Sequence, residues 1–298
     1  MHPRLLVFLF GLVAGLGLAA CGPSTEQRAA TITFGRSLQD HGELVSNETI
    51  YLRSETKTMR VLAMSLPSAQ SATQFNLEAY KNLGNGLSEP RIQRMVQIGG
   101  AAREFGGSLA KVADLTSSTA DEKIFSAATR QLLLTAGAIG SAASTVNVGA
   151  PAVNALTFLS TEHYRLKYLE QALPAAEPAF STADEDVSAE FDRGNPNSLL
   201  SEFSAAIEQL AVILGASQWS GATSARDREI VANSYRTVAR NRDHIKYVTG
   251  RELELMNKAA LAYDAVTAAY QGDSSRLDAV DTYSIAVLEV NLAFQSLK

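Results

Sequence analysis

Apolar residues recur at spacings of three, four and seven along nearly the whole chain from residue 31 onward, and this helical period constrains the fold more than any other feature. The stripe is clear between residues 34 and 66, where Phe34 and Leu38 begin it. Residues 47–57 alternate and hold β-branched side chains, so a strand remains an alternative there. No fixed-period sequence repeat occurs, which disfavours a solenoid. We therefore predict an all-α fold, an elongated antiparallel bundle of about seven to nine helices.

Proline, glycine and capping residues indicate where these helices begin and end. Pro67 ends the first helix, and a second is expected over residues 69–83. Ser88, followed by a proline in the first turn, predicts the start of the next helix. Residues 224–271 are expected to form one long helix that Gly250 bends.

Four glycines fall within the expected helix that follows Ser88, and each costs about 1 kcal/mol of helix propensity relative to alanine. Gly99 and Gly106 lie on its inner stripe, whereas Gly100 and Gly107 follow them directly. Small residues on such a stripe let two helix backbones approach closely. Tight packing against another helix is therefore the simplest compensation, and a hinge is the alternative.

Composition excludes several classes of protein. The chain has 26 Lys and Arg against 31 Asp and Glu, for a net charge of −5, which argues against a nucleic-acid binder. Hydrophobic residues make up 46% of the chain, enough to form a core, so a disordered chain is excluded. A single cysteine excludes a disulfide scaffold, and the overall amino-acid composition excludes a polytopic membrane protein.

A basic residue, an apolar run and a cysteine preceded by small residues follow one another at the N-terminus. Arg4 precedes the apolar run of residues 5–18. That run fits the hydrophobic region of a secretory signal and is shorter than the roughly 20 residues that a membrane span needs. The run leads into the only cysteine of the chain. The residues of this motif are Leu18, Ala19, Ala20, Cys21 and Gly22.

This arrangement resembles the signal peptide and lipobox of bacterial lipoproteins. The resemblance implies that the signal peptidase recognises Leu18, Ala19, Ala20 and Gly22, and that the thiol of Cys21 is acylated. It also implies sorting to the outer membrane, because no Asp follows the cysteine. The resemblance further implies three acyl chains, which give stable anchoring because each buried CH₂ contributes about 0.8 kcal/mol.

The resemblance and the periodicity together give the expected organisation of the chain. Residues 1–20 are the lipoprotein signal peptide, and residues 21–30 are the lipidated cysteine and a polar tether. Residues 31–298 form a single helical-bundle domain with an acidic, proline-bearing connector at 174–197. We expect the body to face the periplasm in preference to the cell surface.

The chain holds no motif that predicts a reaction centre. His41, His163 and His244 are far apart in sequence and lack the spacing of paired metal ligands. Ser108 and Lys111 match the SxxK pattern of penicillin-binding proteins and serine β-lactamases, but the companion SDN and KTG elements are absent, so the match is attributed to chance. We predict no catalytic residue, no metal and no cofactor.

Two groups of charged residues are interpreted as solvated surface. The acidic run at residues 184–190 lacks the spacing of an EF-hand loop, which favours a solvated linker over a cation site. A basic group near the C-terminal third is interleaved with acidic residues, which favours a salt-bridged outer face over a lipid or nucleic-acid patch. Its members are Arg226, Arg228, Arg236, Arg240, Arg242, Lys246 and Arg251.

Residues 131–161 contain no charged residue. We interpret them as a helical hairpin buried at the centre of the bundle, where charges are excluded. The alternative is a membrane-active hairpin that resembles helical pore-forming toxins in pattern only, although neither arm reaches the length of a span.

Three functional hypotheses follow from these observations. The first is a non-enzymatic, outer-membrane-anchored scaffold or binding protein with a partner protein in the cell envelope and no nucleic-acid partner. The second is a membrane-active protein that inserts the 131–161 hairpin. The third, an enzyme of unfamiliar type, requires polar side chains that converge in a cleft.

Overall fold

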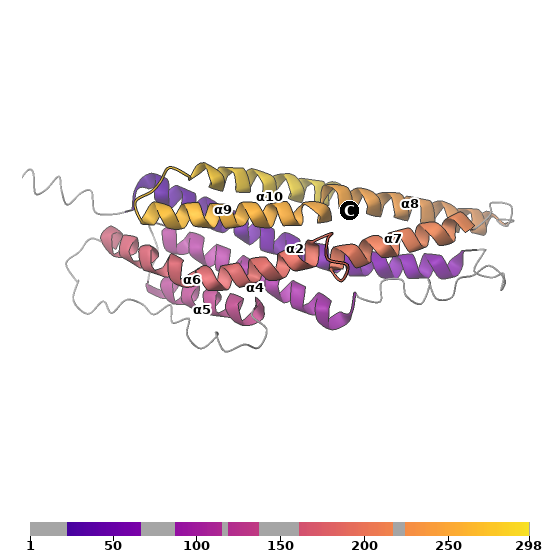
Figure 1. Ribbon diagram of the computed structural model, residues 1–298, viewed down its shortest axis with the longest axis horizontal. Helices are drawn as coiled ribbons and strands as arrows, with labels where there is room; N and C mark the ends of the chain where they lie inside the picture. The colour runs from indigo at the N-terminus through magenta and orange to yellow at the C-terminus, as the bar shows by residue number, and fades with distance from the viewer. Residues whose placement is uncertain (1–22, 67–86, 115–118, 137–160, 217–223, 298) are drawn as a thin grey trace, which may run out of the picture.

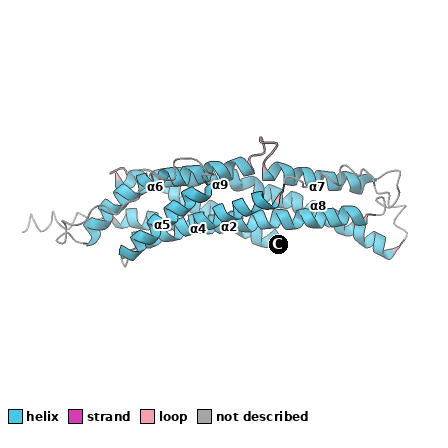
Figure 2. Cartoon of the chain, turned by 90° about the horizontal axis from the view of Figure 1, so that it is seen from below, coloured by secondary structure: helices cyan, strands magenta, loops and turns pink. Residues whose placement is uncertain are grey.

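The computed structural model describes residues 23–66, 87–114, 119–136, 161–216 and 224–297, and in these ranges the chain forms eight α-helices and one 3₁₀ helix (Figure 1). No described residue lies in a strand, so the all-α prediction is confirmed (Figure 2). The alternative of a strand at residues 47–57 is wrong, because these residues lie inside the first described helix. The elements are α2 (Thr25–Ser65), α4 (Glu89–Ala113), α5 (Thr119–Ala136), α6 (Thr161–Phe191), α7 (Leu199–Ala216), α8 (Ala225–Tyr247), η3 (Thr249–Arg251), α9 (Glu252–Tyr270) and α10 (Asp278–Leu297).

Helix α2 is the axis of an elongated bundle. Its 41 residues correspond to a length of about 60 Å at 1.5 Å per residue. It packs against α4, α7, α8, α9 and α10. We call α7, α8 and the C-terminal part of α2 the distal arm, and the other helices, with the N-terminal part of α2, the proximal body. Figure 1 shows the two end to end along the long axis, with the distal arm on the right.

Glycines on α2 and α4 face one another, as the glycines on the inner stripe predicted. A Cβ on Gly99 would lie 2.6 Å from the carbonyl oxygen of Gly42, and one on Gly106 would lie 2.5 Å from that of Gly35. No side chain fits between backbones at such distances. The prediction of tight packing is therefore confirmed for these two glycines, whereas Gly100 has open space beside it.

The proximal body departs from a purely antiparallel bundle. Helices α2 and α10 run in the same direction, because Phe34 and Tyr51 of α2 contact Tyr283 and Phe294 of α10 in the same order.

Helices α5 and α6 form a second parallel pair. Tyr164, near the start of α6, donates a hydrogen bond to Glu122 in the first turn of α5. Arg94 of α4 joins the other ends, because it contacts both the carbonyl oxygen of Ala136 and the carboxylate of Asp186. Helices α5 and α6 therefore run in the same direction. Residues 137–160, which join them, lie outside the described residues.

The acidic connector expected at residues 174–197 is wrong for most of its length. Helix α6 continues to Phe191 with Pro174 and Pro178 inside it. A proline inside a helix costs about 3 kcal/mol. Burial outweighs this cost, because α6 carries its apolar face through both prolines into the core. The core residues of this stretch are Leu173, Ala176, Ala179 and Phe180.

Two other expectations about boundaries need correction. The polar tether expected at residues 21–30 is shorter, because α2 begins at Thr25 with a capping box between Ser24 and Gln27. The long helix expected over 224–271 is instead α8 and α9, separated by η3 at Gly250. The helix expected over 69–83 lies outside the described residues.

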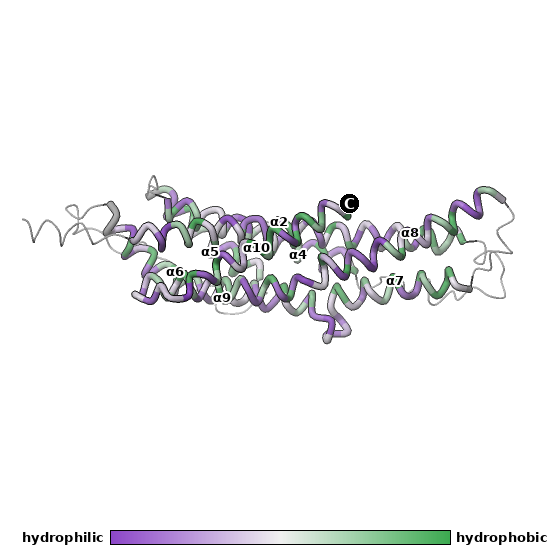
Figure 3. The backbone as a smooth tube through the Cα atoms, turned by 90° about the horizontal axis from the view of Figure 1, so that it is seen from above, coloured by the Kyte–Doolittle hydropathy of each residue, from purple (hydrophilic) through white to green (hydrophobic). Residues whose placement is uncertain are grey.

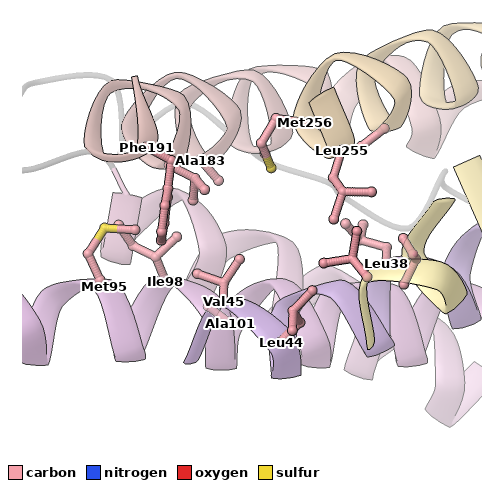
Figure 4. Packing of buried hydrophobic residues seen from close by; sticks show 14 of the residues in the cluster. Leu38, Leu44, Val45, Met95, Ile98, Ala101, Ala183, Phe191, Leu255 and Met256 are labelled. Carbon is pink, nitrogen blue, oxygen red and sulfur yellow. The ribbon is translucent and has the colours of Figure 1, made fainter. Parts of the chain in front are cut away.

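The core of the proximal body is aliphatic and aromatic. Phe34 of α2 contacts the rings of Phe180, Tyr263 and Tyr283, which come from α6, α9 and α10. Figure 4 shows Val45, Ile98 and Met256 around one interior space, and a cavity of about 20 Å³ lies between them. Hydrophilic and hydrophobic residues alternate along the helices, as an amphipathic bundle requires (Figure 3).

The uncharged stretch 131–161 is described only at its ends. Residues 131–136 are the last turns of α5, where Leu132 and Leu133 are buried in the core. This agrees with the interpretation of a buried arm, and the rest of the hairpin lies outside the described residues. Within the described ranges, none of the helices combines the length and the apolar character that crossing a bilayer requires.

Candidate functional site

The helix break between α8 and α9 lies near the middle of the bundle. Val248 leaves the helical conformation (φ −123°, ψ −83°), and the chain makes one 3₁₀ turn before α9 begins. A Cβ on Gly250 would lie 2.6 Å from both the Arg193 guanidinium and the carbonyl oxygen of Ile245. The glycine therefore permits the close packing of the α6–α7 loop on this turn.

Polar side chains from five elements are buried around this break. We call them the break cluster: His41 and Glu48 of α2, His244 of α8, Thr249 of η3, Glu252 at the start of α9, and Tyr283 of α10. None of the six is more than 1% exposed. Buried ionisable residues are uncommon unless they are paired, so the cluster needs a physical explanation.

His41 joins α2 to α9 and α10. Its Nδ1 lies 2.8 Å from the hydroxyl oxygen of Tyr283, and its Nε2 lies 2.9 Å from Oε2 of Glu252. Both ring nitrogens are therefore satisfied. Burial is the main cause that lowers the pKa of His41 to about 4, against smaller opposite effects of Glu48 and Asp184. At neutral pH the ring is uncharged.

Glu48 and Glu252 form a pair of carboxyl groups in the same buried space. They lie close enough for the charge of Glu252 to raise the pKa of Glu48, and a hydrogen bond between them requires a proton on one of them because two carboxylates can only accept. Burial, reinforced by the charge of Glu252, raises the pKa of Glu48 well above its usual range. Burial also raises the pKa of Glu252 to about 7.

His244 lies beside Glu48, on the other side of the carboxyl pair. Its Nε2 lies 3.9 Å from Oε1 of Glu48, beyond hydrogen-bond distance. Its ring stacks on Tyr51 with 4.0 Å between centroids and contacts Phe294 edge-on. Burial, with a smaller effect from Arg240, lowers the pKa of His244 to about 4, so this ring is also neutral at pH 7.

Unsatisfied polar atoms concentrate in the cluster. Of the eleven buried side-chain nitrogen and oxygen atoms without a hydrogen-bond partner among the described residues, six belong to it. A few such atoms are expected in a native protein, and a concentration of them calls for a proton, a water or an ion. The six are both carboxyl oxygens of Glu48, both ring nitrogens of His244, Oγ1 of Thr249 and Oε1 of Glu252.

A chain of polar contacts leads from the cluster toward the surface. Tyr51, stacked on His244, donates a hydrogen bond to Asn241 (2.9 Å), and Asn241 donates one to Glu55 (3.1 Å). Glu55 also pairs with Arg240, whose side chain is 41% exposed. These hydrogen bonds connect Tyr51, which stacks on His244, with the partly exposed Arg240, and they stop short of the carboxyl pair itself.

This arrangement can hold a proton but cannot reach a substrate. All six side chains are closed off from solvent, whereas an acid or base in catalysis must touch the group it protonates or deprotonates. Across the described residues, no three His, Cys, Asp or Glu side chains are placed to hold a metal ion together. The chemistry that these residues support is therefore the storage of a proton in the core.

The predicted lipidation site, Cys21, lies outside the described residues, as do Leu18, Ala19, Ala20 and Gly22. The side chain of His163 is also outside them. Ser108 and Lys111 lie one turn apart beside an open groove of about 790 Å³ between α4 and α5. The Ser108 hydroxyl donates to the carbonyl oxygen of Phe105 (2.9 Å), a contact with its own helix backbone.

Charged residues of the acidic run and of the basic group contribute to contacts between helices. Asp186 and Glu190 of the acidic run pair with Arg94 and Arg91 of α4, and Asp184 lines the internal cavity beside His41, so the interpretation of a solvated linker is wrong.

The basic group is salt-bridged at three positions, although its acidic partners come largely from other helices. These contacts are Arg240 with Glu55, Arg242 with Glu208, and Arg251 with Glu254 and Glu289.

No protein-family model, curated protein or solved structure matches this chain.

The break cluster was missed from the sequence, although a signal was present. His41 and Glu48 occupy positions on the inner stripe of α2, between Leu38, Val45 and Leu52, at spacings of three and four. Ionisable residues at core positions of a stripe indicate a buried polar network.

Proposed function

We propose that the protein is a non-enzymatic rod anchored by an N-terminal lipid to the bacterial outer membrane, where it serves as a scaffold or binding protein of the cell envelope. The observation that carries this proposal is the distance in sequence between Cys21 and α2. Only three residues separate the cysteine from Thr25, where a helix that runs the length of the bundle begins. A lipid on Cys21 would therefore hold the axis of the rod almost directly.

The elongated shape of the bundle supports a role in binding another protein at a distance from the membrane anchor. Helix α2 would place the distal arm about 60 Å from the anchor. The distal arm is a narrow group of three helices, and it exposes Val212 (70%) and Val61 (56%). Such an arm fits contact with another protein better than it fits catalysis, and the buried titratable groups of the break cluster are closed to substrates. We place the rod on the periplasmic face of the outer membrane in preference to the cell surface.

The anchor is tested by fractionation of cells that produce the wild type or Cys21→Ser. We expect the wild type in the outer-membrane fraction and the variant in the soluble periplasmic fraction. A matched control, Ser24→Ala, alters the helix cap without touching the thiol and should remain in the membrane. Membrane association of Cys21→Ser equal to that of the wild type would contradict the anchor.

The scaffold is tested by photocrosslinking from single positions. A photoreactive residue at Val212 samples the distal arm, and one at Leu261, which is 62% exposed on α9, samples the proximal body. We expect a specific envelope protein to crosslink from one of the two positions in wild-type cells and to be lost with Cys21→Ser. Crosslinks to lipid alone, or release of dye from vesicles by the purified protein, would favour the hairpin alternative instead.

A further inference from the structure

We propose that one proton shared between Glu48 and Glu252 holds the helix break against α2, and that loss of this proton in alkaline conditions opens the break. This inference concerns the fold itself and does not rest on the proposed function. Its basis is geometric: Glu48 of α2 and Glu252 of α9 are both fully buried in the break cluster, and among the described residues neither forms an ion pair with a lysine or an arginine. With one proton they attract each other through a hydrogen bond, and without it they are two like charges in the core.

No nearby positive charge in the described part of the chain compensates the repulsion between ionised Glu48 and Glu252. Two like charges in a buried site repel more strongly than they would in water, because the surrounding protein screens them less. The Thr249 hydroxyl lowers the pKa of Glu48 by hydrogen bonding, but it carries no charge that could balance two carboxylates. His41, 2.9 Å from Glu252, and His244, 3.9 Å from Glu48, are the neighbours that could carry a balancing positive charge, and burial keeps both rings neutral. One shared proton is therefore the means by which this core avoids an unpaired charge.

The other charged and titratable groups around the pair do not replace that proton. From α2 they are Asp40, His41, Tyr51 and Glu55, from α6 Asp184, from α8 Arg240 and His244, and from α10 Tyr283. Arg240 is the one fixed cation in this set, and it is engaged by Glu55. Helices α4 and α5 contribute to the neighbouring cavity Ile98, Gly99, Ala102 and Leu132, which carry no charge.

The helix break between α8 and α9 is the part of the structure that would move when the carboxyl pair loses its proton. Helix α2 runs through this region without interruption, whereas the α8–α9 connection is a single 3₁₀ turn of three residues. Glu252 follows that turn directly, and His244 precedes it in the last turn of α8. Separating the two carboxylates therefore needs only a local movement of residues 244–252 away from α2.

The direction of the pH dependence follows from proton linkage. The folded protein holds a proton on this pair in a pH range where the unfolded chain, with ordinary carboxyl groups, has lost it. Raising the pH therefore favours the open or unfolded state. For each extra proton held by the folded state, the folding equilibrium constant falls by up to tenfold per pH unit, from the ordinary carboxyl range upward until the pair loses its proton.

Two measurements on the full chain test the proposal. Infrared spectroscopy detects the C=O stretch of a protonated carboxylic acid, and we expect this band at about pH 7 in the wild type and its loss in Glu48→Gln and Glu252→Gln. Hydrogen exchange, corrected for the intrinsic base-catalysed rate, should rise in residues 244–252 between about pH 6.5 and pH 9, while residues 31–41 of α2 stay protected.

The variants separate the proton from packing. An amide at position 48 or 252 keeps the shape and donates a hydrogen bond at every pH, so we expect the alkaline increase in exchange to disappear. Glu208→Gln is the matched control, because Glu208 is 62% exposed in a surface ion pair with Arg242, and its exchange profile should match the wild type. Absence of the acid band in the wild type, or an unchanged alkaline response in both amide variants, would overturn the proposal.

Discussion

Gly42 of α2 and Gly99 of α4 lie backbone to backbone, so that a Cβ on either one would lie 2.5 or 2.6 Å from the carbonyl oxygen of the other. The same relation holds seven residues away on each helix, between Gly35 and Gly106. These four glycines set the distance between the two helices of the bundle that share the longest contact.

Replacing one of these glycines should destabilise the protein. In Gly99→Ala the new methyl group would meet the α2 backbone, and the helices must separate, at a cost of about 1–3 kcal/mol. The neighbouring Gly100→Ala is the control: nothing lies within 4 Å of its Cβ, so it should stabilise the helix by about 0.5–1 kcal/mol. Urea unfolding followed by circular dichroism measures both. Equal effects from the two substitutions would contradict the close contact.

Removing the hydroxyl of Tyr283 should lower the free energy of unfolding, although the change in size is small. Tyr283→Phe keeps the ring and leaves Nδ1 of the buried His41 without its partner at 2.8 Å, which should cost about 1–3 kcal/mol. Tyr247→Phe removes a hydroxyl from a residue that is 46% exposed, and its effect should be below about 0.5 kcal/mol. The free energy of unfolding at pH 7 distinguishes these expectations, and a neutral Tyr283→Phe would show that His41 does not depend on this bond.

Removal of His244 should improve tolerance to acid. Burial lowers the pKa of His244 to about 4, so between about pH 6.5 and pH 4 the unfolded chain binds a proton that the folded protein refuses. This residue's contribution to stability is therefore lost as the pH falls. Relative to the wild type, His244→Gln should gain about 1.4 kcal/mol per pH unit through that range. Arg242→Gln, on the exposed face of the same helix, should show no such gain. Thermal unfolding from pH 4 to pH 7 provides the comparison.

Arg91 should contribute more to stability than other surface arginines. It pairs with Glu190 of α6 and Glu202 of α7 and donates to the carbonyl oxygen of Asn197, so it ties α4 to both sides of the α6–α7 loop. Its side chain is 23% exposed, and Arg91→Ala should cost about 1–2 kcal/mol. Arg103→Ala, which breaks a 3.8 Å pair at 53% exposure, should cost less than about 0.5 kcal/mol. If high salt removes the difference between the two variants, the Arg91 contacts are screened like ordinary surface pairs.

The helical fold could be predicted because its signals are local. The stripe of apolar residues at three- and four-residue spacings marks the buried face of each helix, and glycine or serine marks many ends. Gly272, for example, ends α9 at φ 101°, a conformation that glycine adopts without strain. Ser198 caps α7 through its hydroxyl, which accepts a hydrogen bond from the amide of Ser201 (3.0 Å).

The parts that sequence reasoning missed depend on tertiary contacts. Pro174 and Pro178 predict the end of a helix, and only the burial of α6 against α9 and α4 keeps it continuous. The break cluster is similar, because His41 and Glu252 are 211 residues apart and nothing local pairs them. A polar residue on an apolar stripe shows that a partner is needed, but not which residue supplies it.

The contact between His41 and Tyr283 joins residues 242 positions apart, which sets an order for assembly during synthesis. At a translation rate of 5–20 residues per second, roughly 12–50 s separate the emergence of the two side chains. The glycine contact between α2 and α4 can form early in that interval, because its partners are close in sequence. The polar core is complete only with the last helix, because His41 can contact Glu252 once the start of α9 has been made but must wait for α10 to supply Tyr283.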